Sequence, residues 1–453
     1  MSEVQVRQPS LTETKGGDHL LIWSDIPFWM VADTEILDII RTFKEPKEVV
    51  TGFKNYQITH PGATWEQFLE VLRHLEKNHL TVGSGNPESG TNDLLENVTI
   101  NITNRCNLRC LTCYNQPLDH GKDSIGTEEI ERLLDSLGDR IKEGATFAIL
   151  GGEPLIVPEL TLKACRIAKD RGMVPIISTN GTLVTKEIAR ELRRNDVELQ
   201  VSLDGATAGT NDRIRGAGTF EKVRKNFAVL VKNKVHTILS MVVCQENFHE
   251  LGEFMELSRK WGASEVRFIP MKRIGLGETG SLTPPSLEMM VKAGAEALKK
   301  DRKIRRKLLR DYFSILAYQC TVCMKRESCG VGIKTVFMDA DGSLYPCPNL
   351  CYPRFRFGSV HQDPSSILKA WESSGGILDV RESYCVDSVE PCSECEVRYW
   401  CGGGCRGESF SVHGKLGLPS ANCKEGKEAI KQMMWTLSEM PDLKRGWAKE
   451  EHF

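Results

Sequence analysis

Residues 106–113 read Cys106-Asn-Leu-Arg-Cys110-Leu-Thr-Cys113, and this stretch predicts the fold of the whole chain. The three cysteines follow a C-x3-C-x2-C spacing, which is typical of an iron–sulfur cluster in which one iron has no protein ligand. A structural zinc loop is the alternative, but zinc usually takes four protein ligands in close pairs. The spacing therefore favours a cluster with one iron open to a small molecule.

The triplet resembles the cluster loop of the radical S-adenosylmethionine (radical SAM) enzymes. The resemblance implies that the open iron binds the amino and carboxylate groups of SAM. It also implies that the reduced cluster cleaves SAM to a 5′-deoxyadenosyl radical. One position departs from the family, because Thr112 stands where an aromatic residue or histidine is usual before the last cysteine. The adenine contact at this position is therefore in doubt.

Alternating strands and helices follow the triplet and predict a parallel sheet covered by helices. No glycine fingerprint of a dinucleotide-binding fold is present, so the pattern favours an α/β fold with a partial (β/α)6 barrel. The expected strands are 98–102, 147–150, 174–177, 197–201, 237–243 and 265–269, and the expected helices are 127–142, 158–171, 186–195, 220–233, 247–261 and 284–300.

Polar and glycine-rich segments stand at the ends of successive expected strands, where chemistry is placed in barrel folds. Each alone is a common turn sequence. In the family that the triplet resembles, these positions contact SAM: the backbone of a GGEP motif binds its amino group, the next two segments its ribose and carboxylate, and a later arginine its carboxylate. The implied cofactor-binding residues are Gly151, Gly152, Glu153, Pro154, Ser178, Asn180, Ser202, Asp204 and Arg215, and Asn211 replaces a frequent histidine.

The last third of the chain is rich in cysteines, which make up 16 residues of the whole sequence. Their spacing, with Gly342 before Cys347, resembles the SPASM extension of radical SAM enzymes. The resemblance implies two auxiliary [4Fe–4S] clusters, so that the chain would hold three. Their implied ligands are Cys323, Cys329, Cys347 and Cys405 for one cluster, and Cys392, Cys395, Cys401 and Cys423 for the other.

Spacing alone leaves zinc open as the metal of these eight cysteines. Cys320, Cys351 and Cys385 are left over. Each can replace a ligand or contact substrate, although idle or buried thiols are commoner. Cys165 and Cys244 fall in helix and strand patterns and are expected in the core.

The N-terminal residues predict a small separate domain. Short apolar runs at 19–23 and 28–31 indicate a β-hairpin, and Asp33 and Thr64 are expected to cap two helices. This order resembles, in topology only, the winged-helix-like PqqD domain, or RiPP recognition element, in which a leader peptide adds as a strand to the hairpin edge. A small domain that only packs on the barrel is the alternative.

We therefore expect six segments. They are a mobile tail at 1–17, the peptide-recognition domain at 18–82, a flexible linker at 83–96, the barrel at 97–310, the SPASM domain at 311–425 and a C-terminal helix or tail at 426–453.

Composition excludes several classes of partner. The net charge is −2, and 26% of residues are charged, so neither a nucleic acid nor a membrane is expected to bind. The basic run at 299–307 is expected to be a solvated face. No apolar run or signal pattern indicates export, so a cytoplasmic protein is expected.

Together these features predict an enzyme that oxidatively crosslinks a ribosomally made precursor peptide. A thioether to an unactivated carbon is favoured, and a carbon–carbon link is also compatible. The expected partners are the precursor peptide and a low-potential electron donor of the flavodoxin or ferredoxin type. The alternatives are maturation of a small molecule or protein cofactor, such as oxidative decarboxylation of a haem precursor, and an electron-transfer scaffold. A sulfatase maturase is disfavoured because Pro348 replaces its aspartate.

Overall fold

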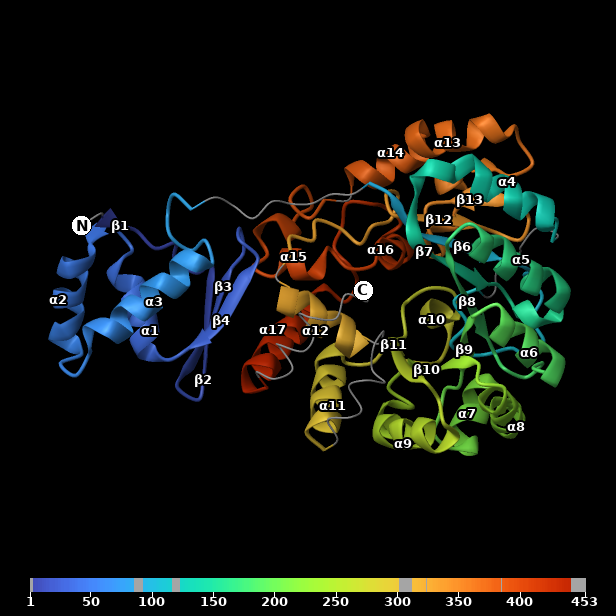
Figure 1. Ribbon diagram of the computed structural model, residues 1–453, viewed down its shortest axis with the longest axis horizontal. Coiled ribbons are helices and arrows are strands. Elements are labelled where there is room, and N and C mark those ends of the chain that lie inside the picture. Colours follow the sequence, from blue (N-terminus) through green and yellow to red (C-terminus); the bar gives the residue numbers. More distant parts are fainter. Residues whose placement is uncertain are drawn as a thin grey trace.

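The computed structural model describes residues 3–84, 93–115, 123–300, 312–322, 324–383 and 385–440. The molecule is elongated, with the N-terminal residues at one end and the large sheet with its covering helices at the other (Figure 1). Among the described residues, no helix is both long and apolar enough to cross a membrane.

One sheet forms the centre of the larger part. In the described residues its strand order is β11-β10-β9-β8-β7-β6-β12-β13-β14. Strands β6 to β11 lie side by side in chain order, all parallel, as helical crossovers require. Their bounds are Leu95–Asn101 (β6), Ile141–Leu150 (β7), Val174–Thr179 (β8), Glu198–Ser202 (β9), His236–Val243 (β10) and Glu265–Pro270 (β11). The predicted partial barrel is confirmed.

Helices connect these strands and pack an apolar face on the sheet. In α4, for example, Ile130, Leu133, Leu134 and Leu137 are buried at helical spacing. The crossover helices are α4 (Thr127–Leu137), α5 (Pro158–Asp170), α6 (Lys186–Arg194), α7 (Ala208–Arg215), α8 (Thr219–Lys232) and α9 (Leu251–Trp261), and α10 (Leu276–Thr279) and α11 (Leu287–Lys300) follow β11. Single 3₁₀ turns stand at Gly138–Arg140, Pro154–Ile156 and Phe248–Glu250.

Two helix predictions in this region need correction. The helix expected at 127–142 ends at Leu137, because Gly138 takes a positive φ of 22° and the chain then enters β7 at Ile141. Helix α7 was not predicted, since its sequence Ala-Gly-Thr-Asn-Asp-Arg-Ile-Arg has almost no apolar face. This helix carries Arg215.

The cysteine-rich region continues the same sheet. Strand β12 (Thr335–Met338) pairs in parallel with β6, and β13 (Ser343–Tyr345) and β14 (Gly358–Ser359) add antiparallel strands. The rest is mostly helical: α12 (Tyr312–Val322), α13 (Pro364–Ser373), α14 (Gly375–Glu382), α15 (Arg398–Cys401), α16 (Arg406–His413) and α17 (Cys423–Glu439), with 3₁₀ turns at Pro348–Leu350, Pro353–Phe355 and Cys392–Glu394. Helix α17 packs on α11 and α12.

The N-terminal unit has its own core and a three-stranded sheet in the order β2-β3-β4. The predicted hairpin is confirmed, and Asp33 and Thr64 cap α1 and α3 through the N–H groups of Ile36 and Gln67. The elements are β1 (Glu3–Val4), β2 (Leu11–Lys15), β3 (Asp18–Trp23), β4 (Phe28–Ala32), α1 (Thr34–Thr42), β5 (Lys47–Glu48), α2 (Val49–Thr59) and α3 (Trp65–Lys77).

The prediction of a mobile tail at 1–17 is wrong. Strand β2 pairs with β3 from Leu11↔Ile22 to Lys15↔Asp18. Gly16 and Gly17, both with positive φ, form the turn between them, as in tight hairpins. Only Leu11 of β2 packs on the core, so the strand showed little apolar alternation in the sequence.

The sheet of the N-terminal unit is buried on both faces. Leu21 and Trp23 face the helices of the unit, whereas Leu20, Ile22 and Trp29 join the main core. The indole Nε1 of Trp29 donates to the carbonyl oxygen of Cys320 on α12 at 2.8 Å. A second contact joins Glu13 to α17, where the carboxylate accepts hydrogen bonds from Lys431 at 2.9 Å and Trp435 at 3.1 Å. The unit is therefore docked on α12 and α17, and most of the linker predicted at 83–96 lies outside the described residues.

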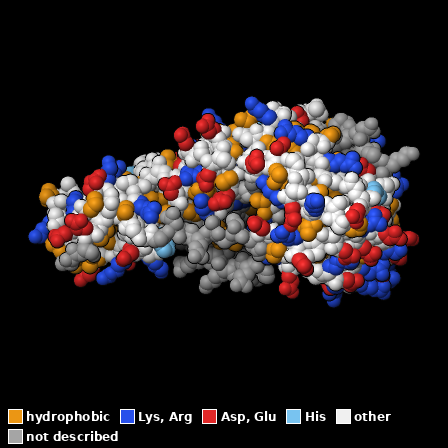
Figure 2. All heavy atoms as spheres, turned by 90° about the horizontal axis from the view of Figure 1, so that it is seen from above, with side chains coloured by type: hydrophobic (Ala, Val, Ile, Leu, Met, Phe, Trp, Pro, Cys, Tyr) orange, Lys and Arg blue, Asp and Glu red, His pale blue; other side chains and the backbone are white. Residues whose placement is uncertain are grey.

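Charged side chains of both signs are interspersed over the face seen in Figure 2. The described Lys and Arg side chains there lie among Asp and Glu side chains. The basic run at 299–307 lies almost entirely outside the described residues.

We expect the Trp29→Phe variant to unfold with a free energy about 1–3 kcal/mol lower, because a buried hydrogen bond and part of the packing are lost. Chemical denaturation of the full chain measures this. The control is Trp65→Phe, which alters a partly buried indole within the N-terminal core. Equal stabilities for the two variants would contradict the importance of the Trp29 contact.

Candidate active site

The segment after β6 forms a loop over the carboxyl ends of the parallel strands. We call residues 103–115 the cluster loop. Beneath it lies a cavity of about 440 Å³, the first cavity. It is lined by residues from the cluster loop, from β7 to β11 and from the cysteine-rich region: Cys106, Leu108, Cys110, Thr112, Cys113, Tyr114, Asn115, Leu150, Gly151, Gly152, Ser178, Thr179, Asn180, Gln200, Ser202, Arg215, Ser240, Val242, Arg267, Ile269, Pro270, Met271, Lys272, Ile274, Pro348 and Asn349.

The three cysteines of the cluster loop face this cavity together. Burial raises the pKa of the Cys110 thiol to about 11, Arg215 lowers it, and Cys113 and Cys106 raise it further. The thiols are therefore close enough to interact. Metal coordination removes the proton from such thiols, so the donor set fits an iron–sulfur cluster. No three His, Cys, Asp or Glu side chains of the described residues converge tightly enough for a single metal ion.

Two glycines allow the cluster loop to touch the end of β7. A Cβ on Gly151 would lie 2.2 Å from the carbonyl oxygen of Thr103, and one on Gly152 would lie 2.2 Å from that of Arg105. The N–H groups of Gly152 and Glu153 donate to these same two carbonyls, at 2.8 and 2.9 Å. The sequence predicted that the glycines admit a ligand. In the structure they also admit the backbone of the cluster loop.

Glu153 and Asn180 extend this contact to the end of β8. The carboxylate of Glu153 accepts hydrogen bonds from the hydroxyl of Thr179 at 2.6 Å and from the N–H groups of Asn180 and Leu155, and it is fully buried. The amide of Asn180 donates to Asn107 of the cluster loop at 2.9 Å.

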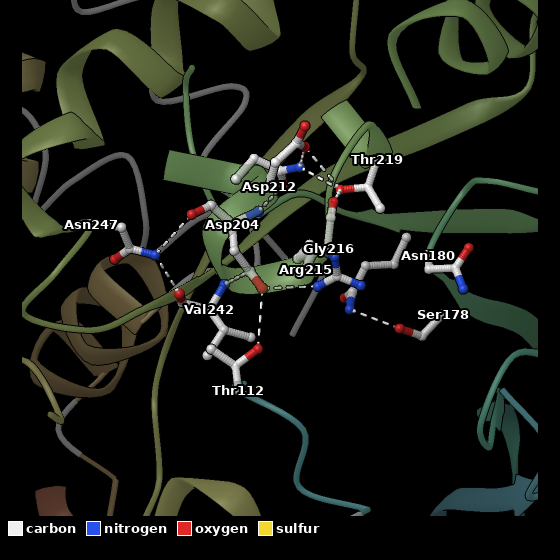
Figure 3. Close-up of polar contacts among 12 residues, drawn as sticks. Thr112, Ser178, Asn180, Asp204, Asp212, Arg215, Gly216, Thr219, Val242 and Asn247 are labelled. Carbon is white, nitrogen blue, oxygen red and sulfur yellow. Dashed lines mark hydrogen bonds and ion pairs between the residues drawn. The ribbon is translucent and has the colours of Figure 1, made fainter. Parts of the chain in front are cut away.

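A buried ion pair lies at the end of β9 (Figure 3). The Asp204 carboxylate accepts from Arg215 at 2.9 Å, from the hydroxyl of Thr112 at 3.1 Å and from the N–H of Val242 at 2.8 Å. Asn211 accepts a hydrogen bond from the Asp204 N–H at 3.0 Å. Arg215 is about 9% exposed, and Asp204 raises the pKa of its guanidinium despite the burial. Thr112 thus joins the cluster loop to the ion pair that orients Arg215.

The structure brings most of the predicted cofactor-binding residues to the first cavity. Gly151, Gly152, Ser178, Asn180, Ser202 and Arg215 line it, whereas Glu153, Pro154 and Asp204 lie behind the lining. The carboxylates of Glu153 and Asp204 already accept hydrogen bonds from protein groups. Their side chains therefore orient the lining.

The predicted auxiliary cysteines form two groups. Cys392, Cys395 and Cys423 interact with Cys401, whose pKa burial and these neighbours raise to about 11. We call these four the distal group. Likewise, burial raises the pKa of Cys347, and Cys405 and Cys329 raise it further. We call Cys329, Cys347 and Cys405 the proximal group, and Cys323, its fourth predicted member, lies outside the described residues.

A second cavity of about 360 Å³ lies between these groups. Cys329 and Cys405 of the proximal group line it, as do Cys401 and Cys423 of the distal group. Of the remaining thiols, Cys165, Cys244 and Cys320 are fully buried in cores, as expected for the first two. Cys351 lies beside the proximal group, with its Sγ 3.3 Å from the carbonyl oxygen of Pro348, and Cys385 is half-buried.

Sequence reasoning missed the segment that ends β11. Arg267, Met271 and Lys272 line both cavities, and Arg267 donates to Gln200, which donates to Ser178. The rule that function gathers at strand ends would have found them. No signal in the sequence placed Pro348 and Asn349 in the first cavity, because they come from the cysteine-rich region.

A sequence profile of the Radical SAM superfamily matches residues 100–258, which run from the end of β6 through the cluster loop and β7 to β10 into α9. The chain is a radical SAM enzyme. It is homologous to the peptide-modifying SPASM maturases.

Two sequence relatives illustrate the range of this family. The mycofactocin maturase MftC of Mycobacterium tuberculosis (strain ATCC 25618 / H37Rv) is 29% identical over 335 residues, which are 73% of this chain and 83% of that protein. The AdoMet-dependent heme synthase of Methanosarcina barkeri is 27% identical over 336 residues, 69% of this chain and 91% of that protein.

Among solved structures, SuiB of Streptococcus suis bound to its precursor peptide SuiA has the same fold. The TM-score is 0.59 at 14% identity, and the match covers 93% of this chain and all of that one. This likeness supports the fold assignment: a small N-terminal β region, a parallel partial barrel and a cysteine-rich C-terminal region.

We expect the Thr112→Val variant to bind SAM about tenfold more weakly, a loss of roughly 1.4 kcal/mol, because the cluster loop loses its bond to a charged group. Its iron content should equal that of the wild type. Calorimetry under anaerobic conditions measures the affinity, and Thr112→Ser, which keeps the hydroxyl, is the control. Wild-type affinity in the valine variant would contradict this role for Thr112.

Proposed function

We propose that this radical SAM enzyme oxidatively crosslinks a ribosomally made precursor peptide, joining a cysteine sulfur to an unactivated carbon. The observation that carries the choice of a peptide is the N-terminal unit. Its strand β4 pairs with β3 on one side, and among the described residues no strand pairs with its other side. An open strand edge of this kind binds extended peptides through main-chain hydrogen bonds.

The proposed leader site lies beside an aromatic group at the start of β4. Phe28 at the start of β4 faces His74 of α3, with ring centroids 6.4 Å apart. Phe28 is partly buried and also contacts Trp23 at 5.9 Å. A leader strand added beside β4 would lie against this aromatic group, whose pocket would select its side chains.

Three [4Fe–4S] clusters are part of the proposal. Cys106, Cys110 and Cys113 hold the first, whose open iron binds SAM in the first cavity. The proximal group with Cys323 holds the second, and the distal group holds the third. The reduced first cluster supplies the carbon radical by cleaving SAM. The lining orients SAM, with Arg215 near its carboxylate and the backbone of Gly151 and Gly152 near its amino group.

The two auxiliary clusters suit an oxidation. Formation of a thioether removes two hydrogen atoms from the peptide, one as an atom and one as a proton and an electron. When bound, an auxiliary cluster would supply an acceptor for that electron, and a low-potential donor of the flavodoxin or ferredoxin type would supply the electron for SAM cleavage. A carbon–carbon link has the same balance and is tested below.

The likeness to a heme synthase supports one alternative, the oxidation of a small molecule in the first cavity. A reaction like that of the sulfatase maturases would need a base, and the position after Cys347 is Pro348, which lines the cavity without a proton acceptor. A peptide substrate gives the N-terminal unit a function. A small-molecule substrate does not.

We expect the reconstituted enzyme, with SAM, a reductant and the precursor peptide, to form 5′-deoxyadenosine and a peptide lighter by two hydrogen atoms. Mass spectrometry after treatment with iodoacetamide measures both features. A thioether leaves one cysteine fewer to alkylate, whereas a carbon–carbon link leaves all of them. A peptide unchanged in mass, together with decarboxylation of a porphyrin substrate, would contradict the proposal.

The Phe28→Ala variant should bind the leader peptide about tenfold more weakly, or roughly 1.4 kcal/mol, because the aromatic group beside β4 is lost. Fluorescence anisotropy with the full chain measures this. The matched control is Phe53→Ala, which truncates another partly buried ring of the same core, on α2. Equal affinities for the two variants would argue against the β4 edge as the binding site.

A further inference from the structure

The two cavities meet at the end of β11. The residues common to their linings are Arg267, Ile269, Pro270, Met271 and Lys272. Cys106, Cys110 and Cys113 face the first cavity, and the second is bordered by the proximal and distal groups. This segment therefore separates the place where SAM is expected from the place where the auxiliary clusters are expected.

Lys272 is held firmly at this junction. Its carbonyl oxygen accepts a hydrogen bond from Ile274 at 2.9 Å, and a Cβ on Gly277 would lie 2.1 Å from the same oxygen. On one side Met271 donates to Val243 of β10 at 2.9 Å, and on the other the N–H of Arg273 donates to Glu408 at 3.0 Å. The backbone is thus fixed from the barrel and from α16 together.

Lys272 is solvent-exposed, and it lines both cavities. Cys329 and Cys405 line the second cavity together with Lys272, and its amine is also close enough to Glu408 and Cys347 to interact electrostatically. All three described members of the proximal group therefore lie near this one cation.

We propose that Lys272 is a positioning residue whose positive charge raises the reduction potential of the proximal auxiliary cluster, so that this cluster accepts the electron released by the substrate. The proposal rests on the function proposed above. A [4Fe–4S] cluster with four thiolates is anionic and gains one more negative charge on reduction. A cation beside it stabilises the reduced form more than the oxidised form.

The electron balance of the step is complete. The 5′-deoxyadenosyl radical takes a hydrogen atom from a peptide carbon and becomes 5′-deoxyadenosine. The new carbon radical bonds to a cysteine sulfur, whose thiol loses a proton to solvent, and the adduct loses one electron. A cluster held by the proximal group would take up that electron and be reduced by one unit. Lys272 favours this transfer by charge alone and exchanges no proton.

The test is a redox titration monitored by electron paramagnetic resonance. It does not require catalytic turnover. In the Cys106→Ala/Cys110→Ala/Cys113→Ala background only the auxiliary clusters remain, with about eight irons per chain. Adding Lys272→Met should lower the equilibrium constant for one-electron reduction of the proximal cluster at least tenfold. This corresponds to a fall of about 59 mV in its reduction potential. The Glu408 carboxylate then lies beside the cluster without a neutralising cation. Its negative charge also lowers the reduction potential.

Two controls isolate the charge. Lys272→Arg keeps a cation at the junction and should leave the potential near that of the parent. Arg273→Met removes the neighbouring cation, whose exposed side chain lies outside both cavity linings, and should also leave it unchanged. If the triple background is not recovered folded, the same titration is made on the holoenzyme with SAM bound, because SAM changes the signal of the first cluster.

The outcomes separate the two proposals. An auxiliary cluster with the same potential in Lys272→Met and in the parent overturns the role of Lys272 and leaves the proposed function standing. A background protein without iron, or with zinc in the cysteine-rich region, overturns the auxiliary-cluster assignment, and the role of Lys272 falls with it. A shift in Arg273→Met equal to that in Lys272→Met also overturns the inference, since position at the junction would then not matter.

Discussion

The close contact between the cluster loop and the strand ends is the constraint on which the site depends. The backbone of residues 103–105 lies so near Gly151 and Gly152 that no side chain fits between them. Farther along, Asn107 is bonded to β8 through Asn180, and Thr112 is bonded to β9 through Asp204. A loop held at three strand ends presents its cysteines in one arrangement, and this preorganisation is what a cofactor site needs.

Specific side-chain contacts also join the N-terminal unit to the helices of the cysteine-rich region. The N-terminal sheet rests on α12 and α17 through Trp29 and Glu13. Helix α17 begins at Cys423 of the distal group, and α12 ends just before Cys323. The N-terminal unit proposed to bind the leader peptide therefore packs on α17, the helix that begins with a proposed auxiliary ligand.

Much of the fold followed from local patterns. Apolar runs of strand length, alternating with amphipathic helices, identified the six parallel strands, since each pattern reports burial of that element alone. The patterns failed where the local signal was weak. Strand β2 is polar apart from Leu11, and helix α7 lacks an apolar stripe. Helix α4 ends before Gly138, although the sequence pattern predicted a helix that continues to residue 142. Strand β2 is held by its hairpin partner β3, and α4 ends where Gly138 takes a positive φ.

The sequence by itself determined which residue types gather at the strand ends, because cysteine spacing and parallel order are properties of the chain alone. It also marked the two cysteine groups that the structure draws together. Only the tertiary structure decided what each side chain does there. Glu153 and Asp204 orient the lining from behind it, and Lys272 stands between two cavities, because these roles depend on which backbone and side-chain groups folding brings into contact.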